Sequence, residues 1–334
     1  MSLVESPVEA LIEAQHIMAT DPRHARGGHA PDYEDGAAFI IDDYVPLSRA
    51  AVPITDLGFN RGDAVYDVVS VSRGMFFRLA DHQERFAASC DRIRVTNPFS
   101  RAREAEILNH IVALTGRRDA YVWFGVTRGK TPMNSADRTN PAKFSNRYYA
   151  YVLPYIFIAN DEMRARGANA IISRNYLRIP PKSVDPTAKN LHGLDFSQSL
   201  FEAGDAGAEW SILTDGQGNI TEAPGSNLFL VKGDKLITPA EWCLLGITRK
   251  TALELGQEIG MSCEVRPVSV AETLAADEVF YTSSAGGIMP LNSIDGTLIG
   301  GVEGPGPITA RLHNLYWEKR WAGWHGVPVD YSVV

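Results

Sequence analysis

Asp185-Pro-Thr-Ala-Lys-Asn-Leu191 is the stretch around which the rest of the chain can be interpreted. Lys189 follows a turn that contains a proline, and it stands before a predicted helix over 195–206. Most lysines are exposed and solvated, and that is the ordinary interpretation of this one. The alternative is a lysine that forms a Schiff base with a carbonyl compound, its amine activated by burial and a neighbouring cation.

A glutamate follows in Asn219-Ile-Thr-Glu-Ala-Pro-Gly-Ser-Asn-Leu-Phe229. Glu222 is interpreted in one of two ways. It is a solvated turn carboxylate, or it is the acid that keeps a pyridine ring nitrogen protonated, which makes the ring a better electron sink.

An arginine precedes both, in Phe77-Arg-Leu-Ala-Asp-His-Gln-Glu-Arg85. The first interpretation of Arg85 is an exposed helix arginine with Asp81 four residues earlier. The second is a clamp on a phosphate group, for which the planar guanidinium is suited.

Two segments of small residues are candidate anion sites. Gly246-Ile-Thr-Arg249 opens a predicted helix over 248–259, and backbone N–H groups at a helix start bind anions, although Thr248 as an N-cap would use the same position. Thr282-Ser-Ser-Ala-Gly-Gly287 follows a predicted strand and forms either a phosphate cradle or a plain turn.

The order of these pieces resembles the class IV aminotransferases, which are pyridoxal-phosphate enzymes of fold type IV. Leu245–Thr251 and Ser284–Pro290 carry the resemblance together with the lysine and glutamate segments. Within that superfamily the chain is most similar to the (R)-selective amine transaminases, through Ala64–Val71 and Phe76–His82. Branched-chain and D-amino-acid aminotransferases are related to these enzymes.

The resemblance implies a two-domain α+β fold of the D-amino-acid aminotransferase type, with pyridoxal 5′-phosphate as cofactor. It implies that Lys189 is the catalytic residue, bound to the cofactor as a Schiff base. Glu222 would contact the pyridine nitrogen, and Tyr66 would line the substrate pocket. The residues implied for the phosphate are Arg85, Ile247, Thr248, Ser283 and Ser284.

The implied reaction moves an amino group from a primary amine, of (R) configuration, to a keto acid such as pyruvate by a ping-pong route through pyridoxamine phosphate. Two alternatives remain on the same fold. One is a D-amino-acid or branched-chain amino-acid aminotransferase. The other is a lyase of the aminodeoxychorismate type, which releases pyruvate.

The chain departs from its relatives at the positions that bind substrate. Asn134 stands where related amine transaminases often carry an arginine for the acceptor carboxylate, so either Lys130 or Arg138 substitutes for it or the carboxylate is held otherwise. Arg61 replaces a histidine and either binds a carboxylate or pairs with Asp63 or Asp67.

Gly193 is a further departure, because it follows His192 where relatives commonly carry an aromatic residue. The missing side chain is expected to leave more room beneath the cofactor. We therefore include Gly193 among the expected substrate-binding positions.

Composition narrows the class of protein. The chain has 334 residues, is 45% apolar and carries a formal net charge of −8, which argues against nucleic-acid binding and against disorder. It contains no apolar run long enough to cross a membrane and begins with acidic residues unlike a signal peptide. Three cysteines without zinc-type spacing predict reduced thiols and no metal site. We expect a cytoplasmic enzyme with small-molecule substrates.

Strands and helices mix without a regular βαβ alternation, which predicts two α+β domains. We expect an N-terminal helical arm over 1–35, a small domain over 36–154 and a large cofactor-binding domain over 155–334. Class IV enzymes form dimers in which a loop of one subunit closes the site of the other. The polar segment 128–146 is the expected loop.

Overall fold

The computed structural model describes residues 7–334, and this part of the chain forms two compact units. The Lys189 unit comprises Ile17–Ile156, Ala188–His192 and Gly323–Val334. The Glu222 unit comprises residues 7–16, Phe157–Thr187 and Gly193–Ala322. Each unit combines helices with one sheet, which confirms the predicted α+β class. The chain enters the Lys189 unit three times, whereas the sequence predicts one continuous small domain.

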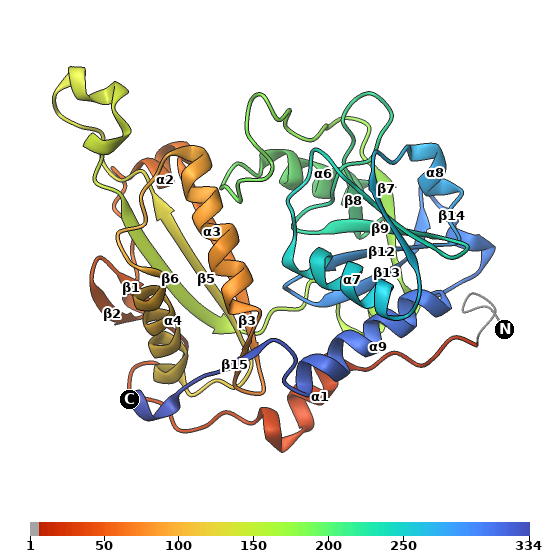
Figure 1. Ribbon diagram of the computed structural model, residues 1–334, viewed down its shortest axis with the longest axis horizontal. Helices are drawn as coiled ribbons and strands as arrows, with labels where there is room; N and C mark the ends of the chain where they lie inside the picture. The colour runs from red at the N-terminus through yellow and green to blue at the C-terminus, as the bar shows by residue number, and fades with distance from the viewer. Residues whose placement is uncertain (1–6) are drawn as a thin grey trace. The chain divides into compact units, whose positions relative to one another are not determined.

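The Lys189 unit is built on a seven-stranded antiparallel sheet in the order β15-β4-β3-β5-β6-β1-β2 (Figure 1). Its strands are β1 (Ala37–Ile40), β2 (Asp43–Pro46), β3 (Ala64–Ser72), β4 (Met75–Phe77), β5 (Ala120–Thr127), β6 (Arg147–Pro154) and β15 (Gly326–Pro328). Its helices are α2 (Leu57–Arg61), α3 (Leu79–Ile93) and α4 (Arg101–Thr115), and α1 (Ala14–Thr20) begins in one unit and ends in the other.

The two faces of this sheet differ because successive side chains of a strand point to opposite sides. One face carries fully buried residues such as Val69 and Phe124, and it packs against α3, whose Phe86 ring lies 4.9 Å from that of Phe124. The opposite face carries half-buried aromatic residues, Tyr66 and Trp123 among them. One face therefore forms the core, and the other presents an aromatic surface.

The Glu222 unit contains a mixed sheet in the order β11-β10-β9-β12-β13-β7-β8, with β14 paired to β13. Its strands are β7 (Ala168–Ile172), β8 (Trp210–Ile212), β9 (Asn227–Lys232), β10 (Lys235–Pro239), β11 (Ser262–Arg266), β12 (Glu278–Ser283), β13 (Gly287–Ile294) and β14 (Thr297–Leu298). Its helices are α5 (Asp161–Arg166), α6 (Leu194–Asp205), α7 (Ile247–Glu258), α8 (Val270–Leu274) and α9 (Pro307–Trp321).

The centre of this sheet is buried almost throughout, because β9, β12 and β13 consist mainly of apolar residues covered on both faces. Phe229 and Phe280 stack across β9 and β12 with ring centroids 5.0 Å apart. The helices α7 and α9 contact each other and the strands β12 and β13. This rigid centre holds the ends of β9 and β12 that carry the candidate site.

The sequence predicts strands over 120–127 and 227–232 and a helix over 307–321, and β5, β9 and α9 confirm them with the same bounds. The expected starts of two helices are wrong. The sequence predicts a helix over 81–93 with Asp81 as its N-cap, whereas α3 already begins at Leu79 and Asp81 pairs with Arg78 at 3.2 Å. Thr248 is not an N-cap either, because Gly246 occupies that position. Apolar periodicity marks the buried face of a helix and says little about its ends.

The N-terminal helix is also shorter than expected. Apolar spacing predicts it over 8–18, whereas α1 covers Ala14–Thr20. The backbone N–H groups of Gln15 and His16 donate to the Asp161 carboxylate at the start of this helix, at 3.2 and 2.7 Å. The Asp161 carboxylate therefore caps the first turn of α1. Because Asp161 is distant in sequence, the local pattern of residues 8–18 does not predict where the helix begins.

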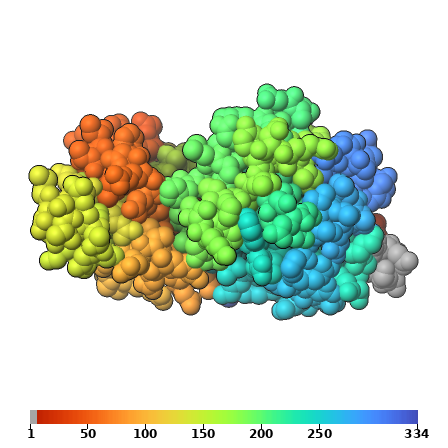
Figure 2. All heavy atoms as spheres, turned by 90° about the horizontal axis from the view of Figure 1, so that it is seen from above, coloured from red at the N-terminus to blue at the C-terminus, as the bar shows by residue number. Residues whose placement is uncertain are grey.

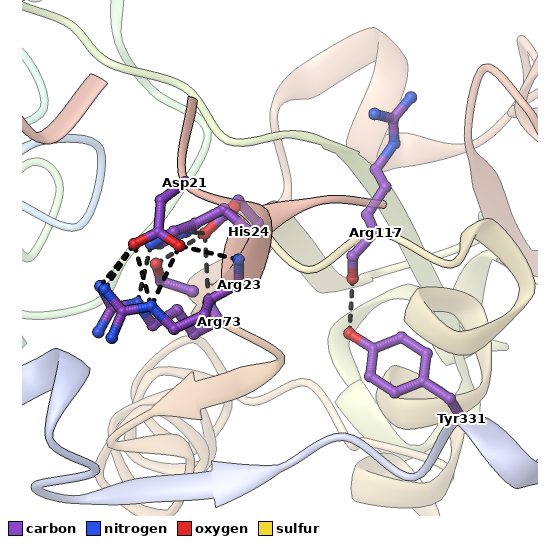
Figure 3. A network of polar contacts seen from close by, with 8 residues as sticks. Asp21, Arg23, His24, Arg73, Arg117 and Tyr331 are labelled. Atoms are coloured by element: carbon purple, nitrogen blue, oxygen red, sulfur yellow. Dashed lines mark hydrogen bonds and ion pairs between the residues drawn. The ribbon is translucent and has the colours of Figure 1, made fainter. Parts of the chain in front are cut away.

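A polar network fastens the N-terminal arm and the C-terminal segment to the Lys189 unit (Figure 3). His24 is buried; its Nδ1 lies 2.8 Å from the Asp119 carboxylate, and its Nε2 accepts a hydrogen bond from Nε of Arg73 at 2.9 Å. Near the C-terminus the Tyr331 hydroxyl donates to the carbonyl of Arg117 at 2.6 Å. The arm is thus anchored to the turn that joins β3 to β4.

The segment between β5 and β6 is the long loop expected over 128–146. It contains two short 3-10 helices, Ser135–Thr139 and Pro141–Lys143, and most of its residues are exposed on the surface of the Lys189 unit (Figure 2).

In the part of the chain that the structure describes, no helix is both long and apolar enough to cross a membrane. Cys90, Cys243 and Cys263 are free thiols, the last one only partly buried. Over residues 7–334 no group of three His, Cys, Asp or Glu side chains is placed to hold a metal ion.

Glu104 on α4 is a buried carboxyl group with an altered pKa. It is 2% exposed and accepts hydrogen bonds from Gln83 Nε2 at 3.0 Å and Asn97 Nδ2 at 2.7 Å. Burial raises its pKa to about 7, against the lowering effect of those two amides. Because the pKa of the folded state lies above the ordinary 4.5, the contribution of this group to stability is present at low pH and is lost as the pH rises through about 7.

We expect Glu104→Gln to flatten the pH dependence of stability. The free energy of unfolding should fall less between about pH 5 and pH 8 than in the parent protein, by about 1–3 kcal/mol. Denaturant titration at both pH values measures this difference. Glu106→Gln is the matched control, because Glu106 lies on the same helix with a side chain that is 65% exposed. Equal slopes for Glu104→Gln and the parent would contradict the prediction.

Candidate functional site

Lys189 lies in a short segment whose backbone is fastened to β3 and α3. Its N–H donates to Ser89 Oγ at 3.1 Å, and its carbonyl accepts from the N–H of Tyr66 at 2.9 Å. The next residue, Asn190, forms an isolated bridge with Val65. The main chain on both sides of the lysine is therefore fixed to the sheet.

The side chain of Lys189 is half-buried, unlike an ordinary surface lysine. Its Nζ lies 4.4 Å from the centroid of the Tyr66 ring, a cation–π distance. Within residues 7–334 it forms no ion pair. The Lys189 amine is therefore not held in an ion pair with a carboxylate, and it remains available to a carbonyl compound.

A row of stacked aromatic rings begins at Tyr66. The ring of Trp123 on β5 stacks on Tyr66 with centroids 5.6 Å apart, and Tyr151 on β6 stacks on Trp123 at 5.2 Å. Gly125 makes this possible, because a Cβ there would lie 2.5 Å from the indole ring. The strands thus present a flat aromatic wall beside the lysine amine.

Arg85 lies on α3, one turn before Ser89, and is bound to β3. Its Nε and Nη2 donate to the two carboxylate oxygens of Asp67 at 2.8 and 2.7 Å, and its side chain is only 11% exposed. The interpretation as an exposed helix arginine is therefore wrong. In the Lys189 unit the amine of Lys189 contacts Tyr66, and Arg85 is bound to Asp67, the residue after Tyr66 on β3.

Glu222 is buried in the other unit and is not a solvated turn carboxylate. Its Oε1 accepts from Arg178 Nε at 2.8 Å, and its Oε2 accepts from the N–H of Leu244 at 3.0 Å. Arg178 also donates to Asp195 at 2.6 Å and lies over the ring of Phe196. Burial alone would lower the pKa of the Arg178 guanidinium, but the charges of Glu222 and Asp195 raise it.

Sequence reasoning missed Arg178. It stands 44 residues from Glu222 in a loop without a motif, so only the fold reveals that the two meet. A guanidinium and a backbone N–H that both donate to the glutamate favour its ionised form. That form is the one able to hold a proton on a basic ring nitrogen.

The loop that carries Leu244 also sets the start of α7. Asn227 Nδ2 donates to the carbonyl of Leu244 at 2.7 Å, and a Cβ on Gly246 would lie 2.2 Å from Asn227 Oδ1. In the described chain no side chain caps the helix, so the first N–H groups, at Ile247 and Thr248, are not used by a capping side chain. This is the arrangement that binds anions at helix starts.

Ser283 and Ser284 lie where β12 ends, and β12 is the neighbour of β9 in the sheet. Thr282 pairs with Asn227 across these strands. Among the described residues, the hydroxyl oxygens of Thr282 and Ser226 are buried without a hydrogen-bond partner. Buried polar atoms of this kind are uncommon and point to a ligand that would satisfy them.

Gly193 stands at the N-cap position of α6 without a side-chain cap. A Cβ there would meet only Phe196, at 3.9 Å, an ordinary van der Waals contact. The local packing therefore does not require a glycine here, and its small size remains a candidate substrate feature.

Arg61 and Arg138 line one pocket of about 400 Å³ in the Lys189 unit, together with Arg94 and Arg128. Its one acidic residue, Asp63, is bound by Arg128 at 3.0 Å. The other alternative partner of Arg61 is occupied as well, because Asp67 is bound by His82 and Arg85. Within the described residues, Arg61 forms no ion pair with Asp63 or Asp67.

Asn134 does not take the place of the missing arginine. Its side chain accepts from the N–H of Ala136 at 3.1 Å and caps the 3-10 helix that carries Arg138. Lys130 is exposed and does not line the pocket. Of the two substitutes expected from the sequence, Arg138 is the one that shares a pocket with Arg61.

Comparison with known proteins gives one consistent result. The family model for amino-transferase class IV matches residues 64–294. Branched-chain-amino-acid aminotransferase-like protein 2 of Arabidopsis thaliana is 30% identical over 87% of this chain, which spans 51% of that protein. The D-alanine aminotransferase of Bacillus licheniformis is 33% identical over 79% of this chain and 90% of that enzyme.

A solved structure shows the same fold. The branched-chain amino acid aminotransferase from Thermobaculum terrenum, determined in its pyridoxal-phosphate holo-form, superposes with a TM-score of 0.77 at 26% identity. The match covers 89% of this chain and 99% of that one. The expected two-domain fold of type IV is confirmed.

We expect Gly246→Ala to destabilise the protein by about 1–3 kcal/mol, because the new methyl group would overlap Asn227 Oδ1 and displace the loop. Thermal unfolding measures the loss. Gly204→Ala on α6 is the control, because a Cβ at that position meets nothing within 4 Å and alanine favours a helix. Similar midpoints for the two variants would show that the contact does not hold the loop.

Proposed function

The chain belongs to the class IV aminotransferases, and from that premise we propose that it moves an amino group from a primary amine of (R) configuration to a keto acid such as pyruvate. Transaminases of this family use pyridoxal 5′-phosphate. The observation that carries the substrate proposal is the aromatic wall of Tyr66, Trp123 and Tyr151 beside the amine of Lys189. A flat apolar surface suits the aryl or alkyl group of an amine better than a second carboxylate.

The residues fit this cofactor, which offers an aldehyde, a phosphate dianion and a basic ring nitrogen. Lys189 supplies an amine that has no ion pair in the described chain. Within that same part of the chain, the hydroxyls of Thr282 and Ser226 are buried and unsatisfied, and the start of α7 has no side-chain cap. Glu222, held by Arg178, supplies a buried acceptor for a ring N–H.

We assign the roles accordingly. Lys189 attaches the cofactor covalently through Nζ, and Glu222 accepts the hydrogen bond of its protonated ring nitrogen. The residues proposed to bind the phosphate are Arg85, Ile247, Thr248, Ser283 and Ser284. Tyr66 and Gly193 are proposed to contact the substrate.

When bound, the cofactor supplies an electron sink for the negative charge that develops on the substrate carbon. Once the substrate amine has displaced Lys189 from the cofactor, the freed Nζ removes a proton from that carbon and returns one as the amino group is transferred, which is general acid–base catalysis by a positioned amine. The backbone hydrogen bonds to Ser89 and Tyr66 keep the lysine in place during these steps. The keto acid enters after the first product leaves, so the kinetics are of the ping-pong type.

We further propose that Arg61 and Arg138 bind the carboxylate of the keto acid. They share a pocket in which the only acid among the described residues is already bound by Arg128. Guanidinium groups without a carboxylate partner are suited to an anionic substrate.

A D-amino-acid aminotransferase is the second candidate. Its support is the 33% identity to a D-alanine aminotransferase and the same arginine-lined pocket, which would hold the carboxylate of an amino acid. A branched-chain activity has the support of the Arabidopsis thaliana relative and of the Thermobaculum terrenum structure.

We also propose that the enzyme is a cytoplasmic homodimer. Large apolar side chains are exposed in the Lys189 unit, among them Ile54, Phe59 and Met133 at 77%, 67% and 97%. Exposed apolar side chains of this size support an interface with a second copy. A sedimentation mass equal to one chain would refute the dimer.

The deciding experiment presents the protein with pyridoxal 5′-phosphate, pyruvate and each enantiomer of 1-phenylethylamine. We expect the (R)-amine to turn over at least about tenfold faster than the (S)-amine, because a chiral site stabilises the transition states of the two enantiomers unequally. Borohydride reduction followed by peptide mapping should mark Lys189, and Lys189→Ala should lose about 10²–10⁴-fold in rate.

The outcomes separate the candidates. Lys182→Ala, at an exposed lysine in the preceding loop, should keep full activity. Faster turnover of D-alanine than of the (R)-amine would favour the second candidate. A preference for the (S)-amine or for L-amino acids would refute the (R)-amine proposal.

We expect Arg138→Gln to raise KM for pyruvate about tenfold or more, because a charge-assisted hydrogen bond is worth about 1.5–3 kcal/mol. The rate of the half-reaction with the amine should not change, since the amine carries no carboxylate. Steady-state kinetics and single-turnover kinetics measure the two quantities. Lys130→Gln is the control from the same loop. An unchanged KM in Arg138→Gln would remove this residue from the substrate site.

A further inference from the structure

We propose that Asp67 is a positioning residue for the cofactor phosphate, because it holds the Arg85 guanidinium in its working orientation before any phosphate binds, and that His82 in turn orients Asp67. The inference deepens the proposed function and rests on the proposed role of Arg85. It concerns three side chains of the Lys189 unit, one on β3 and two on α3.

Asp67 and Arg85 form a two-point contact. Oδ2 of Asp67 accepts from Nε of Arg85 at 2.8 Å, and Oδ1 accepts from Nη2 at 2.7 Å. Two parallel bonds fix both the position and the plane of a guanidinium, which a single bond does not. Asp67 on β3 thereby fixes the orientation of the Arg85 guanidinium on α3.

The carboxylate of Asp67 is itself held from other directions. It is fully buried, and its Oδ1 also accepts from the N–H of Val68 at 2.7 Å and lies 2.8 Å from His82 Nδ1. Burial alone would raise the pKa of Asp67, but the guanidinium charge of Arg85 and the hydrogen bonds from Arg85 and His82 hold it well below its usual value. These contacts therefore favour the negatively charged form of the Asp67 carboxylate.

His82 acts as a neutral donor in this group. It is 2% exposed and stands three residues before Arg85, on the same face of α3. Burial lowers its pKa by more than the neighbouring Asp67 raises it. The negative charge of Asp67 is thus balanced by Arg85, and the imidazole adds orientation without adding charge.

Charge and geometry make opposite predictions for phosphate binding. Asp67 cancels much of the charge of Arg85, so on charge alone its removal would strengthen the binding of a phosphate. Judged by geometry, removing the Asp67 carboxylate weakens phosphate binding. The Arg85 side chain that Asp67 has already ordered loses little conformational freedom when the phosphate binds. The buried two-point contact leads us to expect that geometry dominates.

The test compares the affinity of the apoprotein for pyridoxal 5′-phosphate and for pyridoxal, which lacks the phosphate. In Asp67→Asn we expect the Kd for pyridoxal 5′-phosphate to rise about tenfold, as for the loss of one preordered side chain, and the Kd for pyridoxal to stay unchanged. Arg85→Ala should show a larger loss of the same kind. Adding Asp67→Asn to Arg85→Ala should cause no further loss, because Asp67 acts through the arginine.

His82 supplies a second variant in case Asp67→Asn does not fold. His82→Asn places an amide N–H near the position of Nδ1 and should keep the affinity of the parent. His82→Ala removes the donor and should lose about threefold for pyridoxal 5′-phosphate alone. Circular dichroism confirms that each variant is folded before titration.

Three results would overturn the inference: equal or tighter binding of pyridoxal 5′-phosphate by Asp67→Asn, an equal loss for both compounds, or a further loss in the double variant. A normal ratio of the two affinities in Arg85→Ala would overturn it as well, together with the role of Arg85. The (R)-amine proposal is tested separately, by the turnover of the two amine enantiomers in the parent protein.

Discussion

The hydrogen bond from the N–H of Tyr66 to the carbonyl of Lys189 is the contact on which the candidate site depends. The chain enters the Lys189 unit at Ala188 and leaves it at His192, so the lysine belongs to a short excursion. Such a segment has too few residues to form a core of its own. The strand β3 holds it in place, and the same strand carries the aromatic ring under the amine and the carboxylate that binds Arg85.

The Glu222 unit follows the same rule with different residues. A loop of three residues, Leu244 to Gly246, is held by a carboxylate on one side and an amide on the other. Those contacts decide where α7 begins, and with it the direction of the first backbone N–H groups. In both units, hydrogen bonds of the main chain hold the short segment that carries the group in question: the amine of Lys189 in one unit and the first N–H groups of α7 in the other. Such a segment is less mobile than a side chain that nothing else fixes.

The sequence is informative where the chemistry is local. Strands of apolar and β-branched residues such as 120–127 and 227–232 are predictable because their pattern is contained within a few positions. The lysine, the glutamate and the small-residue loops are identified because they stand in contiguous motifs. The two-residue β14 and the three-residue β15 are not, since too few residues form a pattern.

Partners of buried charges are the least predictable part of the site. Arg178 meets Glu222, and Asp67 meets Arg85, across distances in sequence that only the folded chain closes. The sequence places Asp67 close to Arg61 and so suggests that pair, whereas the register of β3 turns Asp67 toward α3 instead. Such a pair depends on the face of the strand that a residue occupies and on the helix that covers this face. A few neighbouring residues in the sequence determine neither of the two.

The strand β15 determines how the C-terminal part of the chain can be shortened or extended. β15 (Gly326–Pro328) completes the sheet of the Lys189 unit by pairing with β4, the strand that leads directly into the helix of His82 and Arg85. Trimming the C-terminus would leave β4 as an uncovered edge with unpaired backbone groups, a known starting point for aggregation. A purification tag is therefore better joined through a flexible spacer after Val334 than in place of the terminal residues.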